Sequence, residues 1–237
     1  MATNLLPPIE APARVLAIGA HPDDVEHFAG ATIAGLAESG SAISLVVCTD
    51  GARGGHESGD LAERRRREAE RAAEALGVGA PLFLGFRDGD LVVDDHIRKA
   101  LVQEIRRVRP EILLTHDPTT FWKQLGAVHR LGHSDHRAAG TAALDAIIPR
   151  AALGAFYPEH SDMGLKPWFV REIWLFDTNQ PDHFVDVRSM LARKRAAVAC
   201  HVSQNPSALH AEAERHEGSY VDSVGYPAEG FRRLRVF

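Results

Sequence analysis

Short apolar runs alternate with longer segments of mixed apolar and polar residues through the first half of the chain. Four runs, at residues 15–19, 43–48, 81–86 and 111–115, have the length and apolar content of buried strands. The segments between them, 25–39, 60–76 and 94–107, have the pattern of helices that end near Gly40, Gly77 and Pro110. Strands that alternate with such helices form βαβ units. The sequence therefore predicts an α/β fold with a Rossmann-like, mostly parallel sheet flanked by helices on both faces.

The second half of the chain has a less regular pattern. A long loop is expected at 117–132, followed by a helix through about residue 148. Short strands are expected near 153–157, 172–178 and 183–187, and a helix at about 189–201. From residue 206 onward the pattern is irregular apart from a short helix at 207–216. Because no repeat, low-complexity linker or shift in composition divides the chain, we expect a single domain over residues 1–237.

Composition narrows the function classes. The 237 residues carry a formal net charge of -5 and are 45% hydrophobic, so nothing attracts the chain generally to nucleic acid or an anionic membrane. The first eight residues lack the basic and apolar regions of a signal peptide, and no apolar run approaches the roughly 20 residues of a membrane span. Cys48 and Cys200 are too few for a disulfide framework. These features predict a cytoplasmic protein without nucleic-acid or membrane partners.

Chemically active side chains gather at the end of the first predicted strand. His21, Asp23 and Asp24 follow this strand directly, where the next helix begins. Ligands collect at this kind of place in open α/β sheets. Pro22 fixes its φ angle and stiffens the turn. We therefore expect His21 and Asp24 to converge on one point while Asp23 points to a neighbouring one.

A second polar cluster, His133, Asp135 and His136, begins the helix after the long loop. If that loop returns to the same sheet edge, His21, Asp24 and His136 form a set of two histidines and one carboxylate with an open position. Such a set is typical of a catalytic zinc site, although Fe(II) also accepts it. Taken alone, each motif more often marks a polar turn or a helix cap than a metal site.

The remaining polar residues then have roles to fill. Asp23 lies beside the predicted metal ligands, so it can take a proton from the attacking water. His133 can protonate a leaving amine or stabilise a developing oxyanion. Asp135 can hydrogen-bond to His133 and keep its ring charged and oriented. The two clusters together predict metal-dependent hydrolysis.

The two motifs resemble the LmbE-like (PIG-L) de-N-acetylases, which are zinc-dependent hydrolases acting on N-acetylglucosaminyl conjugates and related amides. The resemblance covers most of the chain. Its further matches are Thr49-Asp50-Gly51, Arg67-x-x-Glu70, Leu84-Gly85-Phe86-Arg87-Asp88-Gly89, Lys194-Arg195-Ala196-Ala197 and His201-Val202-Ser203-Gln204. It implies a small N-acetylated substrate and leaves room for a homo-oligomer.

Carried over by position, the resemblance implies roles for seven residues. They are His21, Asp24 and His136 as zinc ligands, Asp23 as general base, His133 as the electrostatic or general-acid partner oriented by Asp135, and Arg67 as a substrate contact. Asp88 is a further candidate for contact with a sugar hydroxyl, although it also fits a turn residue before Gly89. One departure matters. Some members have a tyrosine that assists the oxyanion two residues before the histidine matched by His133, and here this position is Leu131.

The sequence thus predicts a metal-dependent hydrolase that removes an N-acetyl group from an amino-sugar conjugate or a similar small N-acyl compound. Two alternatives stay open. A metal-dependent phosphoesterase uses similar ligands, but it usually needs more carboxylates and cationic groups on the phosphate. A non-catalytic sugar- or nucleotide-binding module needs no turnover at all.

Overall fold

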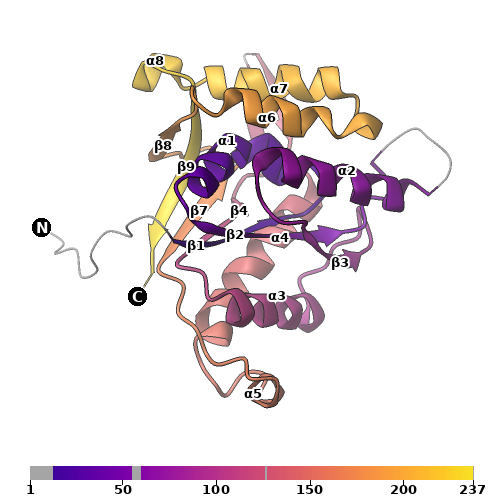
Figure 1. The fold of residues 1–237 in the computed structure, drawn as a ribbon, viewed down its shortest axis with the longest axis vertical. Helices are drawn as coiled ribbons and strands as arrows, with labels where there is room; N and C mark the ends of the chain where they lie inside the picture. Colours follow the sequence, from indigo (N-terminus) through magenta and orange to yellow (C-terminus); the bar gives the residue numbers. More distant parts are fainter. Residues whose placement is uncertain (1–12, 55–59, 126, 237) are drawn as a thin grey trace, which may run out of the picture.

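The computed structural model describes residues 13–54, 60–125 and 127–236 (Figure 1). These residues form a seven-stranded sheet in the order β3-β2-β1-β4-β7-β9-β8, and a separate hairpin, β5-β6. The strands are β1 (Arg14–Gly19), β2 (Ala42–Thr49), β3 (Leu82–Phe86), β4 (Ile112–His116), β5 (Trp122–Leu125), β6 (Val128–Leu131), β7 (Glu172–Phe176), β8 (His183–Asp186) and β9 (Ala228–Arg235). The pairs from β3 to β7 are parallel, and β9 is antiparallel to both of its neighbours.

Helices cover both faces of the sheet (Figure 1). Val15 and Ala17 of β1 pack in the core under α1, α2 and α6, whereas Leu16 and Ile18 pack in the core under α3 and α4. The longer helices are α1 (Asp24–Glu38), α2 (Leu61–Leu76), α3 (Asp95–Val108), α4 (Ser134–Asp145), α6 (Leu191–Ala199) and α7 (Pro206–Gly218). Short helical segments are η1 (Ala146–Ala151), α5 (Glu159–Asp162), η2 (Val202–Gln204) and α8 (Val221–Val224). The predicted α/β fold with a mostly parallel, two-sided sheet is confirmed.

The centre of the sheet positions the polar clusters. β1 and β4 are neighbours, and all five residues of β4 are buried, as are the last five of β1. From β1 the chain continues to β2 on one side, and it returns to β4 on the other side. Such a reversal of strand order leaves a crevice at the carboxyl ends of the two strands. The loop before α1 and the final residue of β4, His116, lie at this crevice.

The strand expected at 153–157 is absent, and that prediction is wrong. The segment forms turns around the buried guanidinium of Arg106, which donates hydrogen bonds to the backbone carbonyls of Arg150 (2.8 Å), Leu153 (2.9 Å) and Phe156 (3.0 Å). A buried carbonyl must find a donor, and here a side chain from α3 replaces a neighbouring strand.

Three further strand pairings escaped the sequence analysis. The expected loop at 117–132 contains the antiparallel hairpin β5-β6, which pairs Trp122 with Leu131. The segment expected to be irregular contains β9, which bridges β7 and β8, and α7 extends the expected short helix at both ends.

Among the described residues, no helix has both the length and the apolar character needed to cross a membrane.

Candidate active site

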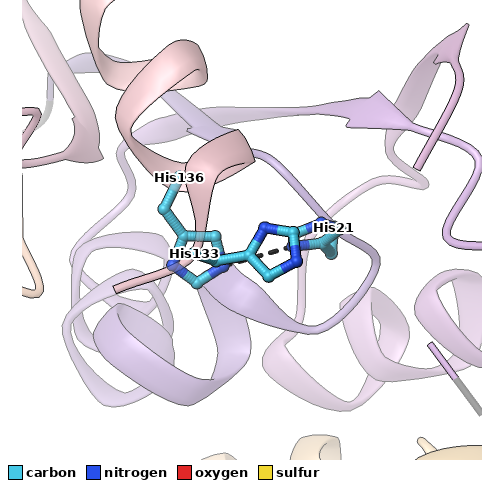
Figure 2. A group of neighbouring side chains, drawn as sticks. All are labelled: His21, His133 and His136. Carbon is cyan, nitrogen blue, oxygen red and sulfur yellow. Dashed lines mark hydrogen bonds between the residues drawn. The ribbon is translucent and has the colours of Figure 1, made fainter. Parts of the chain in front are cut away.

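The residues predicted from two distant motifs meet at the crevice between β1 and β4. His21 lies in the turn after β1 and Asp24 begins α1, whereas His133 and His136 come from the start of α4. Figure 2 shows the rings of His21, His133 and His136 gathered at one point, with the two α4 histidines facing the turn after β1. The long loop therefore does return to the sheet edge, as the metal prediction requires.

The three predicted metal ligands present their donor atoms to a common point. Nδ1 of His21 lies 3.2 Å from Nε2 of His136 and 3.6 Å from Oδ2 of Asp24. Nε2 of His136 lies 3.2 Å from Oδ1 of Asp24. In a tetrahedral zinc site with bonds of about 2.0–2.1 Å, neighbouring donors are about 3.3 Å apart. The donor spacing fits one small divalent cation with an open position.

Carboxylates hold the outer nitrogen of the first histidine. Nε2 of His21 lies 3.2 Å from Oδ1 of Asp88 and 3.3 Å from Oδ2 of Asp135, and both carboxylates are buried. Asp135 also accepts hydrogen bonds from the backbone N–H of Gly89 (2.7 Å) and Leu91 (3.3 Å). The expected hydrogen bond from the Asp135 side chain to His133 is therefore replaced by a contact with His21. Asp88 lines the cavity but holds His21 as well.

The second histidine has a matching partner that the sequence analysis missed. Nδ1 of His136 lies 3.7 Å from Oδ2 of Asp177, whose other oxygen lies 2.5 Å from Nζ of Lys123. Asp177 follows β7 directly, so its place after a buried strand was a signal. Histidines that bind metals usually have a carboxylate or carbonyl on the other ring nitrogen. Both candidate ligands show this arrangement, which supports a metal site.

His116, at the end of β4, is the other missed residue. Its Nε2 lies 2.9 Å from Oδ2 of Asp24, and its ring stacks on His136 with 4.0 Å between centroids. Burial lowers the pKa of His116 to about 4, and the charge of His136 acts in the same direction. The neutral ring of His116 therefore supports Asp24 from beneath, and it adds a fourth donor atom beside the ligand set.

The charges of the site favour a cation. Burial lowers the pKa of His21, but contacts with Asp135 and two further carboxylates outweigh burial and raise it to about 12. Burial raises the pKa of Asp24, but the charge of His136 and the hydrogen-bond contact with His116 outweigh burial and lower it. Without a metal, these carboxylates draw protons onto the histidines. A divalent cation would satisfy the same negative charge, so the donor set fits one.

Asp23 lines the cavity beside the ligand set but points to a different partner. Its Oδ1 lies 3.2 Å from Nη2 of Arg65, a buried residue of α2. Burial raises the pKa of Asp23 to about 6, although the charge of Arg65 opposes this. A carboxylate with a pKa near the working pH is suited to both accept and return a proton.

His133 is exposed in the wall of the cavity. Its Nδ1 accepts a hydrogen bond from the backbone N–H of Asp135 (3.2 Å), which caps the start of α4. With Nδ1 as acceptor, the neutral ring carries its proton on Nε2. Burial lowers the pKa of His133, and the nearby charge of His21 lowers it further. The residue is thus arranged to donate an N–H from Nε2.

Two positions differ from what the resemblance implied. Arg67 is not brought to the cavity: its side chain is 56% exposed and pairs with Glu63 at 3.0 Å. The helical turn of α2 instead turns Arg65 inward, two residues earlier. Leu131 lines the cavity mouth, and no tyrosine lines that cavity in the parts of the chain that the structure describes.

The cavity has a volume of about 740 Å³. A smaller cavity of about 290 Å³ adjoins it, and the two share His27, Phe28, Arg130 and Glu212 in their walls. An ion pair between Arg130 of the hairpin and Glu212 of α7 stands at the junction. The two cavities together are therefore larger than the metal site alone, and they extend beneath the β5-β6 hairpin.

Comparison with known proteins agrees with this geometry. The chain is 36% identical over 197 residues to diacetylchitobiose deacetylase of Thermococcus kodakarensis, covering 81% of this chain and 70% of the relative. It is 32% identical to 1D-myo-inositol 2-acetamido-2-deoxy-alpha-D-glucopyranoside deacetylase 2 of Saccharopolyspora erythraea over 66% of this chain. That alignment spans only 62% of the relative's length.

Solved structures share the fold. N,N'-diacetylchitobiose deacetylase from Pyrococcus horikoshii superposes with a TM-score of 0.84 at 30% identity, covering 94% of this chain and 84% of the other. GalB, the 4-carboxy-2-hydroxymuconate hydratase from Pseudomonas putida, superposes with a TM-score of 0.76 at 26% identity, covering 94% and 97%. The family model described as GlcNAc-PI de-N-acetylase matches residues 16–147, which is more than half of the chain. The chain belongs to this family, PIG-L.

Proposed function

We propose that this protein is a metal-dependent hydrolase that removes the N-acetyl group from an amino-sugar conjugate or a similar small N-acyl compound. The observation that carries the proposal is the convergence of His21, Asp24 and His136 at donor spacings of 3.2–3.6 Å beside Asp23. Membership of the PIG-L family and the deacetylase names of its relatives support the same reaction.

A divalent metal held by the three ligands would polarise the acetyl carbonyl and acidify a water. Asp23 accepts the proton that the attacking water loses as its oxygen bonds to the carbonyl carbon. His133 donates its Nε2–H to the developing oxyanion. The C–N bond then breaks, and the proton held by Asp23 passes to the departing amine nitrogen, which leaves acetate and a free amine. Zinc is the metal that this donor set suits best, with Fe(II) as its rival.

The adjoining cavity supports a conjugate rather than a single sugar. Its wall combines the aromatic rings of Phe28 and Tyr220 with polar groups of Asn179, Thr178 and Ser219. Ring faces beside amides and hydroxyls suit a second polyhydroxyl ring. An acetamido sugar bound at the metal site would extend its aglycone past Arg130 into this space.

The rival functions have less support. The four arginines that line the larger cavity are already engaged. Arg65 pairs with Asp23, Arg130 with Glu212 and Arg53 with Asp90, and Arg137 donates to the carbonyl of Gly132. A phosphoesterase would need them for phosphate. A hydratase shares the fold, so fold alone does not decide the reaction.

Metal analysis and amine release together test the proposal. Purified protein is expected to contain about one divalent metal per chain and to release amine from a panel of N-acetylglucosamine conjugates. Asp23→Ala is expected to keep the metal and to lose about 10²–10⁴-fold in turnover. Metal-free protein that binds a sugar without amine release would support the binding module, and phosphate release without amine release would support the phosphoesterase.

A further inference from the structure

One arginine of the charged helix α2 is buried while its neighbours are not. The side chain of Arg65 is 3% exposed, against 52% for Arg66 and 56% for Arg67. A guanidinium leaves water only where several acceptors replace its hydration. The stability of α2 therefore does not explain why this one arginine is buried, and the explanation must lie in its partners.

The acceptors come from two loops that border the active site. Nη2 of Arg65 lies 3.2 Å from Oδ1 of Asp23 and donates to the carbonyl of Pro22 at 3.4 Å. Nη1 donates to the carbonyl of Gly51 at 3.0 Å. The same guanidinium thus contacts the turn after β1, the loop after β2 and the carboxylate of Asp23.

The loop after β2 is shaped to admit this guanidinium. A Cβ atom at Gly51 would lie 2.9 Å from Nη1 of Arg65, and a Cβ at Gly54 would overlap the same nitrogen. Only residues without side chains leave room for the planar group. Although Arg65 borders the cavity, both of its terminal nitrogens, Nη1 and Nη2, are engaged by the protein, and only Nε lacks a hydrogen-bond partner among the described residues.

We propose that Arg65 is the positioning residue of the general base. Nη2 fixes Oδ1 of Asp23 while Nη1 is held by the carbonyl of Gly51, so that the other Asp23 oxygen is presented to the attacking water and the leaving amine. This role rests on the proposed function, because it assigns Arg65 to the proton transfers of Asp23. It replaces the substrate contact expected from Arg67.

Kinetics separate positioning from substrate binding. Arg65→Ala is expected to lower kcat by about 100-fold, the cost of a small misplacement of a catalytic group, with KM changed less than about threefold. Metal content is expected to stay unchanged, since Arg65 contacts no candidate metal ligand and its ion pair with Asp88, which holds His21, is long at 4.0 Å. Added guanidinium ion is expected to restore at least about a tenth of the lost rate in Arg65→Ala and none in Asp23→Ala.

Matched variants guard against a folding artefact. Arg66→Ala, on the same helix and exposed, is expected to behave as wild type. Gly54→Ala is expected to lower kcat by displacing the guanidinium, and Arg65→Lys is expected to recover only part of the rate because it lacks the fork. A rise in KM at unchanged kcat would make Arg65 a substrate contact, and a loss of metal without guanidinium rescue would make it a general scaffold residue. Either result would overturn the proposal.

A crystal structure of Arg65→Lys or Gly54→Ala gives a readout that does not depend on turnover. The Asp23 carboxylate is expected to rotate or to lose order relative to wild type. An unmoved Asp23 would overturn the positioning role, even in an active enzyme. Failure of the wild type to release amine from any N-acetyl sugar would overturn the proposed reaction, and this structural comparison would still decide what orients Asp23.

Discussion

The carboxylate of Asp135 lies 3.3 Å from Nε2 of His21, on the side of the ring away from the nitrogen that faces His136. The same carboxylate accepts the backbone N–H of Gly89 at 2.7 Å. Asp135 immediately precedes His136 in α4. The start of α4 therefore supplies one candidate ligand, His136, and also the carboxylate that supports the other, His21. The two halves of the site are thus connected through α4.

Asp135→Asn should weaken metal binding. The change removes the negative charge that orients His21, and the loss of such a partner typically costs about 10–100-fold in metal affinity. A chelator-competition titration with zinc measures the dissociation constant directly. The control is Asp90→Asn, because Asp90 is 48% exposed and pairs with Arg53 and Arg87, neither of which is a candidate ligand. Equal zinc affinity in both variants would show that His21 needs no support from Asp135.

Tyr220→Ala should separate conjugates from single sugars. The ring lines the smaller cavity but not the larger one, so its loss removes contacts with an aglycone only. We expect KM for N,N'-diacetylchitobiose to rise roughly tenfold, which corresponds to about 1.4 kcal/mol, and KM for N-acetylglucosamine to stay unchanged. Tyr226→Ala serves as control because Tyr226 lines neither cavity. A parallel change for both substrates would place the aglycone elsewhere.

Acid should destabilise the fold through His201. This fully buried ring lies 3.8 Å from Glu26, and neither of its nitrogens has a hydrogen-bond partner among the described residues. Burial lowers its pKa to about 4, and the charge of Arg65 acts in the same direction. The unfolded chain, with a pKa near 6.5, binds this proton first as pH falls. Stability from this group is therefore full above about pH 6.5 and is lost progressively toward pH 4.

From pH 7 to pH 5 this single residue should lower the free energy of unfolding by about 2 kcal/mol. Urea titrations at the two pH values measure the loss, and His201→Leu should reduce it by that amount. Both proteins share the other titrating groups, so the difference between their losses of unfolding free energy from pH 7 to pH 5 isolates His201. Identical losses would mean that the ring already carries its proton in the folded protein.

Gly140→Ala should disturb the fold where α4 crosses β4. A Cβ there would overlap the carbonyl oxygen of His116, so α4 must shift and carry His136 with it. Overpacking of this kind typically costs about 1–3 kcal/mol. Thermal unfolding and zinc affinity should both fall, whereas Gly218→Ala, which meets nothing within 4 Å, should leave both nearly unchanged. A neutral Gly140→Ala would show that α4 can move without cost to the site.

The sequence by itself determined the fold class and predicted His21, Asp24 and His136 as candidate metal ligands. The apolar runs that became β1, β2 and β4 are buried on both faces, and such strands leave a clear hydrophobic signal. His21 and Asp24 are three residues apart in one rigid turn, so their convergence is a local property. His136 followed because a motif with a similar polar pattern begins the helix after β4.

Other features depended on partners that no local pattern contains. β9 pairs with β7 and β8 and carries several arginines, so its pattern lacks the apolar signal of a strand. The turns at 153–157 exist because Arg106 reaches them from α3. Both cases involve hydrogen bonds between segments far apart in the chain, which periodicity does not record.

The roles of the polar residues around the ligands were decided only by the tertiary structure. Asp135 is next to His136 in sequence and near His133, yet its carboxylate holds His21 from another element. Four consecutive arginines begin at Arg64, and only the rotation of α2 against the turn after β1 turns Arg65 inward. A side chain's partner is set by the packing of the element that carries it. Sequence spacing indicates which chemical groups are available, and packing decides which atoms those groups contact.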